Sequence, residues 1–485
     1  MEKNSSPTKK PQKHRPRAYD NALVRFYKPF SYAERRKAAE KAGFNVFQFP
    51  AEMLLVDLLS DSGTTTLTNE QMAEMFLGDE AYGTNAGYPK LVAQFEKTFG
   101  LKKGGFEFFL FHQGRAAEHA LFSQLGKLVR SAVIPSNGHF DTTRANIEAN
   151  SMGACNLFSK KLAGKTYSPF KGDMDTDALA SVLKKEGAHT PLVYTTITNN
   201  TGGGQPVSLE NLRRVRALCT KYKKPFFLDA CRFAENAWFI KQREKKHRTA
   251  SIQKIVHEMF ALCDGFTISL KKDGLSNMGG ALVIKKGSLF MKQFPSLVNA
   301  LRDHQILTEG HPTYGGLTGR DIMVLVKGLE TVVKEEYLAN RVSQVETFGA
   351  YLAELGVPVL TPFGGHAVYI DVDEFFKGTK MRREDFGGVA LTAELLSYGV
   401  RLCELGAFAF GYYDKKTKKE VLPEKNFVRC AVPRNKYEIE DLLYAADCIK
   451  ELYDNRKKLP RAVPVYGRDL SLRHFKARFE LVPLS

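Results

Sequence analysis

The stretch Ser269-Leu270-Lys271-Lys272-Asp273-Gly274 decides our interpretation of the chain. It follows a strand-like run, Gly265-Phe266-Thr267-Ile268, and precedes a second apolar run at 281–284. A lysine at the end of a buried strand, flanked by small residues, is well placed to form a Schiff base. Burial lowers the pKa of its ammonium group and so frees the amine as a nucleophile. Taken alone, the same stretch is more often an exposed turn with two solvated lysines.

A second strand-like run, Pro225-Phe226-Phe227-Leu228, ends in Asp229. A carboxylate at the carboxyl edge of a buried strand faces the crevice where α/β proteins bind ligands. Pyridoxal phosphate needs such an acid, because it keeps the pyridine nitrogen protonated and makes the ring an electron sink. The segment between Asp229 and Lys272 has room for a return strand and for one helix, expected over 252–262. A lone Asp229 is more often a helix cap or an ion pair, but with Lys272 it predicts a cofactor pair.

The apolar segment Phe106–Phe111 predicts a strand, and Gln113-Gly114-Arg115 leads from it into a helix expected over 116–129. Such a turn offers free backbone N–H groups and the positive end of a helix dipole to an anion. Arg115 is suited to a bidentate contact with a phosphate. Because every α/β protein contains strand–loop–helix units, this signal is weak by itself.

The order of elements indicates an α/β protein with two units. Residues 106–284 alternate strand-like and helical stretches, including a buried strand over 192–198, which is typical of a parallel sheet covered on both faces. A long helical region at 321–355 reads as a connector. Further strands are expected at 357–360, 367–372 and 427–432. With 485 residues, the chain is long enough for a three-layer cofactor domain and a smaller α/β domain.

Composition indicates a reduced, cytoplasmic and soluble protein. The seven cysteines are scattered without a Cys-x-x-Cys pair, no apolar run is long enough to span a bilayer, and no signal-peptide pattern opens the chain. Residues 1–18 are expected to be a basic disordered tail, rich in Pro, Ser and Lys. The net charge of +18 suggests solvated basic faces, but no nucleic-acid-binding motif accompanies it. We therefore expect neither a nucleic acid nor a membrane as the main partner.

The motifs together resemble the β-eliminating lyases, a family that releases indole or phenol from aromatic amino acids. They occur in the family's order from about Tyr27 to the C-terminus, which makes the set specific although no single motif is. They are Asp79–Tyr82, His112–Arg115, Gly203–Ser208, Asp229–Ala237, Ser269–Asp273, Pro312–Leu317, Gly364–Ala367 and Leu472–Phe475.

The resemblance implies the aspartate-aminotransferase-like fold, fold type I of the pyridoxal-phosphate enzymes, with a mostly parallel sheet in the large domain. It places the large domain at 68–325 and the small α/β domain at 326–485, with 19–67 forming the N-terminal part of the small domain. It also implies a homotetramer built from dimers and a small amino acid as the substrate.

The resemblance assigns the cofactor site residue by residue. Lys272 matches the lysine that forms the Schiff base and later carries the Cα proton. Asp229 would hold the pyridine nitrogen, and Arg232 would lie near the phenolic oxygen of the cofactor. Phe140 would stack on the ring, and Asn200 with Arg429 would hold the substrate's α-carboxylate. The phosphate would be held by Gln113, Gly114, Arg115 and Ser269.

Two further sites are implied. Tyr82 matches the family's general acid, often supplied across a subunit boundary, and Lys271 would tune it. Ligands for a monovalent cation such as K⁺ would come from Gly63, Glu80 and Asn277. The reaction would then yield pyruvate, ammonium and the protonated leaving group.

The leaving group is predicted from a few positions. Phenol-releasing members follow their stacking Phe with Thr and bind the phenol oxygen with Arg, whereas this chain has Asp141 and Leu405 there. Indole-releasing members have an acid, an aliphatic residue and a His, which is His474 here. Phe47 is a further expected contact of the substrate. These residues favour indole, and hence L-tryptophan as the substrate, although the segment 83–87 departs from both kinds of relative.

Other interpretations stay open at this stage. They are release of phenol from tyrosine, another β-elimination that breaks a carbon–sulfur or carbon–carbon bond, a transaminase, and a non-catalytic basic scaffold. The set of Lys272, Asp229, Tyr82 and Arg429 argues against a scaffold, and Asp141 with His474 argues against a transaminase.

Overall fold

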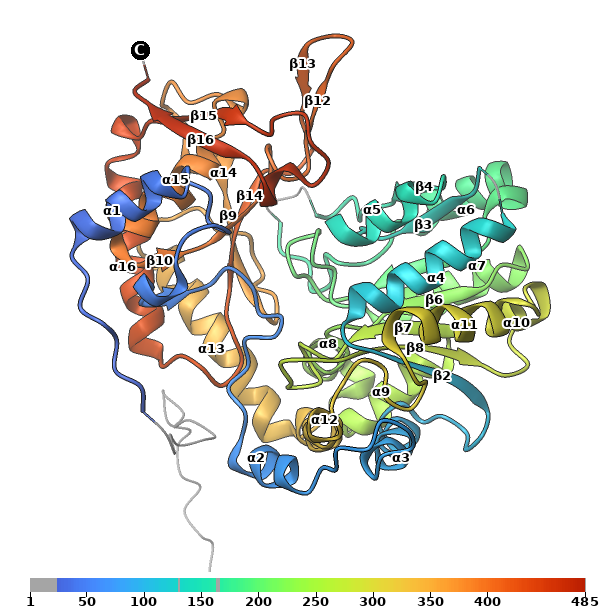
Figure 1. Cartoon of the computed structure of the whole chain (residues 1–485). Helices are drawn as coiled ribbons and strands as arrows, with labels where there is room; N and C mark the ends of the chain where they lie inside the picture. Colours follow the sequence, from blue (N-terminus) through green and yellow to red (C-terminus); the bar gives the residue numbers. More distant parts are fainter. Residues whose placement is uncertain (1–23, 130, 163–165, 485) are drawn as a thin grey trace, which may run out of the picture.

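The computed structural model describes residues 24–129, 131–162 and 166–484, so the expected tail at 1–18 lies outside the described residues. A large mixed sheet forms the centre of one half of the molecule (Figure 1). Four of its neighbouring pairs are parallel, and only β8 runs against its neighbours. In spatial order its strands are β2 (Phe106–Phe111), β8 (Gly280–Lys285), β7 (Gly265–Ser269), β6 (Phe226–Asp229), β5 (Val193–Thr196), β3 (Val133–Ser136) and β4 (Gly153–Asn156).

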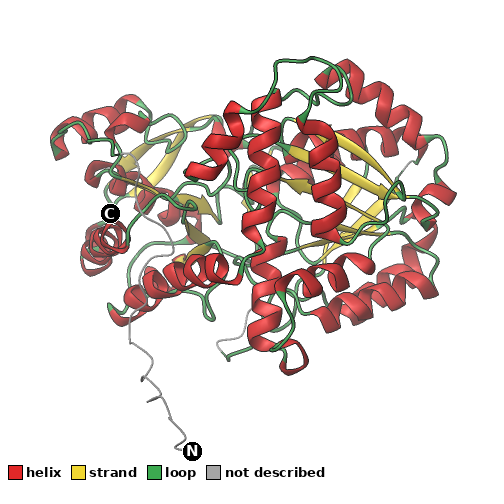
Figure 2. Ribbon diagram, turned by 90° about the horizontal axis from the view of Figure 1, so that it is seen from below, coloured by secondary structure: helices red, strands yellow, loops and turns green. Residues whose placement is uncertain are grey.

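The central strands are buried on both faces because helices cover both sides of the sheet (Figure 2). One face packs against α4 (Gly114–Leu128) and α11 (Leu297–Glu309). The opposite face carries a larger apolar core, to which several helices contribute, among them α3 (Gly87–Phe99), α7 (Leu209–Lys221), α8 (Phe233–Arg243), α9 (Ile252–Ala261) and α12 (Gly319–Val332). The expected three-layer α/β architecture is therefore confirmed.

A second, antiparallel sheet lies in the other half, in the order β11 (Cys403–Leu405), β14 (Phe427–Ala431), β9 (Ala367–Asp371). It shares a core with α13 (Glu335–Glu354) and α16 (Ile439–Asp454). The N-terminal strand β1 (Val56–Asp57) joins this half by pairing in parallel with β10 (Val400–Arg401). The domain boundaries inferred from the sequence stay a prediction, and the one between 325 and 326 falls inside α12.

The remaining helices and strands lie around these two sheets. They are α1 (Tyr32–Lys41), α2 (Asn69–Phe76), α5 (Asp141–Ala149), α6 (Thr176–Glu186), α10 (Leu289–Gln293), α14 (Val372–Phe375), α15 (Gly387–Leu395), β12 (Tyr412–Asp414), β13 (Lys419–Val421), β15 (Arg461–Tyr466) and β16 (Arg478–Val482). In the described part of the chain, no helix combines the length and the apolar character that crossing a membrane requires.

Two details differ from the sequence-based expectations. The helical region expected at 321–355 is two helices, because α12 ends at Val332 and α13 starts anew at Glu335. The strand expected at 357–360 is wrong: only Val359 forms an isolated bridge, to Ile370. Pro358 lacks an N–H group, so this segment cannot extend a regular ladder along β9.

Candidate active site

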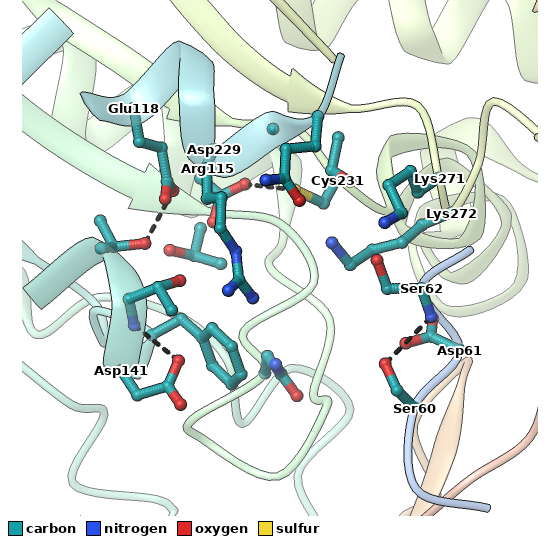
Figure 3. A pocket seen from close by; sticks show the side chains of 18 of the residues that line it. Ser60, Asp61, Ser62, Arg115, Glu118, Asp141, Asp229, Cys231, Lys271 and Lys272 are labelled. Carbon is teal, nitrogen blue, oxygen red and sulfur yellow. Dashed lines mark hydrogen bonds between the residues drawn. The ribbon is translucent and has the colours of Figure 1, made fainter. Parts of the chain in front are cut away.

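A cavity of about 260 Å³ opens where β5, β6 and β7 end, and residues of β11 and β14 line it from the second sheet. Figure 3 shows several of its lining residues, among them Arg115, Asp229 and Lys272. Most of the residues singled out from the sequence line this one cavity, although they come from distant parts of the chain. They are Phe47, Gln113, Gly114, Arg115, Phe140, Asp141, Asn200, Asp229, Arg232, Ser269, Lys271, Lys272, Leu405, Arg429 and His474.

Two neighbouring strands deliver the acid and the lysine. Asp229 is the last residue of β6 and is buried, and the thiol of Cys231 donates a hydrogen bond to its Oδ1 over 2.8 Å. Lys272 follows the end of β7 by three residues and lines the same cavity. Burial, together with the charges of Lys272 and Arg115, lowers the pKa of the Lys271 ammonium. The site therefore places two lysines and a buried carboxylate at the ends of neighbouring strands.

The start of α4 forms a cradle for an anion. Gly114 is its first residue, and a Cβ there would lie 2.5 Å from Cβ and 2.8 Å from Cα of Ser269. Only glycine lets the helix approach the end of β7 this closely. The N–H groups of Gly114 and Arg115 open the helix and have no preceding helical carbonyl to bind, and Arg115 and Ser269 line the same cavity. This arrangement fits a phosphate group.

Arg429 and Asn200 form a polar pair on the other side of the cavity. Arg429 projects from β14, and its Nη1 donates to Oδ1 of Asn200 over 3.1 Å, while its Nη2 donates to the carbonyl of Leu59 over 2.9 Å. The hydroxyl of Tyr369 also donates to Asn200 Oδ1, over 2.7 Å. A guanidinium fixed in this way suits a carboxylate ligand.

Asp141 and His474 meet across the cavity although they are 333 positions apart in the chain. Nε2 of His474 lies 3.0 Å from Oδ2 of Asp141, and both side chains are 6% exposed. The ring of Phe47 packs edge-on against His474, with 5.9 Å between ring centroids. Leu405, from β11, is also buried and lines the same cavity. An acid fixed by a histidine therefore stands in an aromatic and aliphatic wall.

Arg232 already has an acidic partner. Its Nε and Nη2 both bind Asp61, over 2.9 Å and 2.7 Å, and both side chains are almost completely buried. Although burial alone would raise it, the charges of Arg232, His366 and Arg434 hold the pKa of Asp61 well below its usual range. If Arg232 contacts the cofactor's phenolic oxygen as predicted, its guanidinium therefore binds that oxygen and Asp61 at the same time.

The ion pair belongs to a larger buried network whose centre is Arg434. The guanidinium of Arg434 contacts Asp61 over 3.0 Å, Glu235 over 2.7 Å and Asp273 over 2.8 Å, and all four side chains are at most 1% exposed. Asp273 directly follows Lys272 and also accepts the backbone N–H of Ala234 over 2.8 Å. The network thus connects the lysine's turn to the second half of the molecule.

The other predicted residues do not line this chain's cavity. Tyr82 is 61% exposed, and its hydroxyl accepts the backbone N–H of His311 over 3.1 Å. Asn277 and Gly63 are adjacent, since Nδ2 of Asn277 donates to the Gly63 carbonyl over 3.1 Å. Glu80 instead pairs with Arg320 over 3.1 Å on the surface. A single chain therefore brings together only part of the expected cation ligands.

Glu118, Cys231 and Asp61 also line the cavity, although no role was predicted for them from the sequence. Glu118 carried a usable signal, because residues four apart on a helix share a face and it lies four residues after Gly114. The sequence contains no such signal for Asp61, because the partners of Asp61 come from distant segments of the chain.

Comparisons with known proteins agree with this geometry. The model of the family described as Beta-eliminating lyase matches residues 57–448. A tryptophanase from Hyphomonas neptunium is 42% identical over 455 residues, which cover 92% of this chain and 95% of that protein. A tyrosine phenol-lyase from Nostoc punctiforme is 35% identical and covers 96% of each chain. Among solved structures, a threonine aldolase from Leishmania major aligns with a TM-score of 0.56 at 16% identity, over 82% of this chain and 99% of that one.

The solved structures share the architecture of fold type I, which confirms the expected fold class. The cavity also fits pyridoxal phosphate, since it combines an amine, a buried carboxylate, an aromatic ring and a helix start that only glycine permits. Because the family model and the relatives span most of its length, the chain belongs to the β-eliminating lyases and is a pyridoxal-phosphate-dependent lyase.

Proposed function

We propose that this lyase cleaves L-tryptophan to indole, pyruvate and ammonium. The observation that carries the proposal is the Asp141–His474 pair, which lies in the same cavity as Lys272 and Asp229. Leu405 lines that cavity at the position where phenol-releasing relatives are expected to place an arginine. Several relatives are named tryptophanase, which supports the same choice.

When bound, pyridoxal phosphate would supply an electron sink for the bonding electrons released at Cα of the substrate. Lys272 would hold the cofactor covalently, and Asp229 would keep its pyridine nitrogen protonated. Phe140 would stack on the ring. The phosphate would bind at the start of α4 and the end of β7, through Gln113, Gly114, Arg115 and Ser269.

The substrate's α-carboxylate would bind to Arg429, which Asn200 and the Leu59 carbonyl hold in place. This contact would orient the amino acid so that its Cα–H points to Lys272. Once it is free, the Lys272 amine would take that proton. The hydrophobic wall of Phe47 and Leu405 would enclose the side chain and exclude water from it.

Loss of the indole requires a proton on its C3 carbon, and positive charge then develops on the ring. The Asp141 carboxylate is suited to accept a hydrogen bond from the indole N–H and to stabilise that charge. His474 would keep the carboxylate aimed at the ring. Tyr82 would donate the proton from a second copy of the chain, with Lys271 lowering the cost of its ionisation.

The same proposal includes a monovalent cation and an oligomer. The carbonyl of Gly63 and the side chain of Asn277 lie next to each other, and Glu80 would complete the ligand set for K⁺ when two copies meet. The exposed ion pair of Glu80 with Arg320 is weak enough to be replaced. We propose a homotetramer built from dimers.

Replacing Asp141 tests the choice of substrate. Asp141→Ala should lower kcat for tryptophan by about 10²–10³-fold, as loss of an oxyanion-hole donor does, because an interaction made in the transition state is removed. It should affect an S-alkylcysteine much less, because a thiolate leaves without protonation of a ring. Asp177→Ala, an exposed aspartate on α6, serves as the control. Faster cleavage of tyrosine than of tryptophan, or equal losses for both substrate classes, would refute the proposal.

A further inference from the structure

Glu118 is a buried carboxyl group in the cavity to which the mechanism above gives no role. It lies on α4, only 7% exposed, and its Oε1 accepts a hydrogen bond from the Thr143 hydroxyl over 2.7 Å. Figure 3 shows it on the same wall of the cavity as Asp229. A second buried acid therefore stands beside the one assigned to the pyridine nitrogen.

Two neighbouring buried carboxyl groups cannot both ionise without a large electrostatic cost. Burial and the charge of Asp229 raise the pKa of Glu118 to about 8, although Thr143, Lys272 and Arg115 act in the opposite direction. The other titratable groups that face it are the Tyr194 phenol from β5 and the Cys231 thiol. Burial and the charge of Asp229, followed by smaller effects, keep both of these groups neutral by raising their pKa.

Each of the two acids accepts one hydrogen bond among the described residues, so the position of Asp229, and not the hydrogen bonds, indicates which acid keeps the charge. Asp229 receives the thiol hydrogen of Cys231 and lies one strand away from Lys272. Glu118 receives only the hydroxyl of Thr143 among the hydrogen bonds of the described residues. Asp229 is also the group positioned for the pyridine nitrogen. The arrangement that serves the cofactor is therefore the one in which Asp229 is ionised and Glu118 is protonated.

We propose that Glu118 is a positioning residue that stays protonated beside Asp229, so that this wall carries a single negative charge, on the carboxylate facing the pyridine nitrogen. The inference rests on the proposed role of Asp229 but not on the identity of the leaving group. It explains why an ionisable residue occupies an apolar helix face: a neutral carboxyl fills the space and bonds to Thr143 without competing for the cofactor's positive charge.

The experiment compares Glu118→Gln, a neutral side chain of the same shape, with the wild-type holoenzyme. At pH 7 the infrared difference spectrum should contain the C=O band of one protonated carboxyl that the variant lacks, and this band should vanish as the pH rises through about 8. Affinity of the apoprotein for pyridoxal phosphate should change by less than about twofold at pH 7. Glu210→Gln, an exposed glutamate on α7, should leave the band unchanged.

Absence of the band at pH 7, or a tenfold loss of cofactor affinity in Glu118→Gln at that pH, would overturn the inference, because either result means that the ionised form is needed. Thr143→Val provides an independent variant. Since the Thr143 hydroxyl favours the ionised carboxyl, its removal should make the band persist to higher pH. A band that disappears at the same or a lower pH in this variant would also overturn the inference. Neither readout depends on which amino acid is cleaved, so failure of the proposed substrate is seen separately.

Discussion

The two ends of the proposed reaction are built very differently in this chain. Two groups assigned to the cofactor are deeply buried: Asp229 is 5% exposed, and Arg232 is 2% exposed and forms a bidentate pair with Asp61, whereas Lys272 is half-buried and Arg115 is exposed. The groups assigned to leaving-group protonation and cation binding are more exposed: Tyr82 is 61% exposed, and Glu80 pairs with a surface arginine. One chain therefore completes the part of the site that would hold the cofactor. Tyr82 and Glu80, which would protonate the leaving group and bind the cation, lie outside the cavity of their own chain.

This difference indicates which residues need a second copy of the chain in order to act. A general acid that stands in water is poorly placed to direct its proton to one carbon atom, because desolvation and orientation supply much of its efficiency. If Tyr82 acts as proposed, another chain must cover it and bring a cavity to it.

The largest effect is expected among the groups assigned to the cofactor. Replacing Lys272 by Ala should lower turnover on the order of 10⁴-fold or more, because one change removes both the covalent attachment and the general base. In the wild type, borohydride reduction should fix the cofactor on Lys272, and peptide mapping measures this directly. A label on Lys271, or a wild type that shows no visible absorbance after addition of pyridoxal phosphate, would contradict the assignment.

A smaller loss should follow from Tyr82→Phe, which removes one hydroxyl from the exposed part. We expect tryptophan turnover to fall by about 10²–10⁴-fold, the range for loss of a general acid, with a smaller loss for S-alkylcysteine. Tyr314→Phe is the matched control, because it removes a hydroxyl from the ring that neighbours Tyr82. The Tyr82 hydroxyl itself is bound by the backbone N–H of His311.

Mixing the two inactive variants tests the comparison itself. A mixed oligomer of Lys272→Ala and Tyr82→Phe chains contains sites with an intact Lys272 from one chain and an intact Tyr82 from the other. Activity should reappear if Tyr82 acts across the boundary. Mixed oligomers that remain inactive would show that each chain uses its own Tyr82.

The smallest effect is expected at the cation site. Glu80→Gln should weaken activation by K⁺ by about tenfold, the low end for loss of a group that supports a metal site. Activity measured in K⁺ against Na⁺ gives the readout, and Glu70→Gln, an exposed glutamate on α2, is the control. Equal turnover in K⁺ and Na⁺ by the wild type would remove the cation from the proposal.

The sequence predicted the groups that local pattern determines. Asp229 and Lys272 follow apolar strands, and Gly114 opens a helix, so their positions at the sheet edge follow from chain order alone. The pairing of Asp141 with His474 was expected only through the family resemblance. The ion pair of Arg232 with Asp61 was not expected, because it depends on the close approach of segments 171 positions apart. The strand expected at 357–360 does not form, although the segment is apolar, because Pro358 has no N–H group to donate to a neighbouring strand.

The network around Arg434 has a consequence for how the protein is made. Asp273 stands next to Lys272, but the guanidinium that neutralises it is 161 residues further along the chain. During synthesis the sheet that carries the lysine emerges first. Asp61 and Glu235 also bind Arg232 and Arg341, respectively, but until Arg434 follows, Asp273 lacks its guanidinium partner and has to remain hydrated, because a buried unpaired charge is strongly destabilising. The turn that carries the lysine can therefore take its final form only when nearly the whole polypeptide has left the ribosome. A nascent chain that stalls before that point would expose its amine to solvent instead of enclosing it.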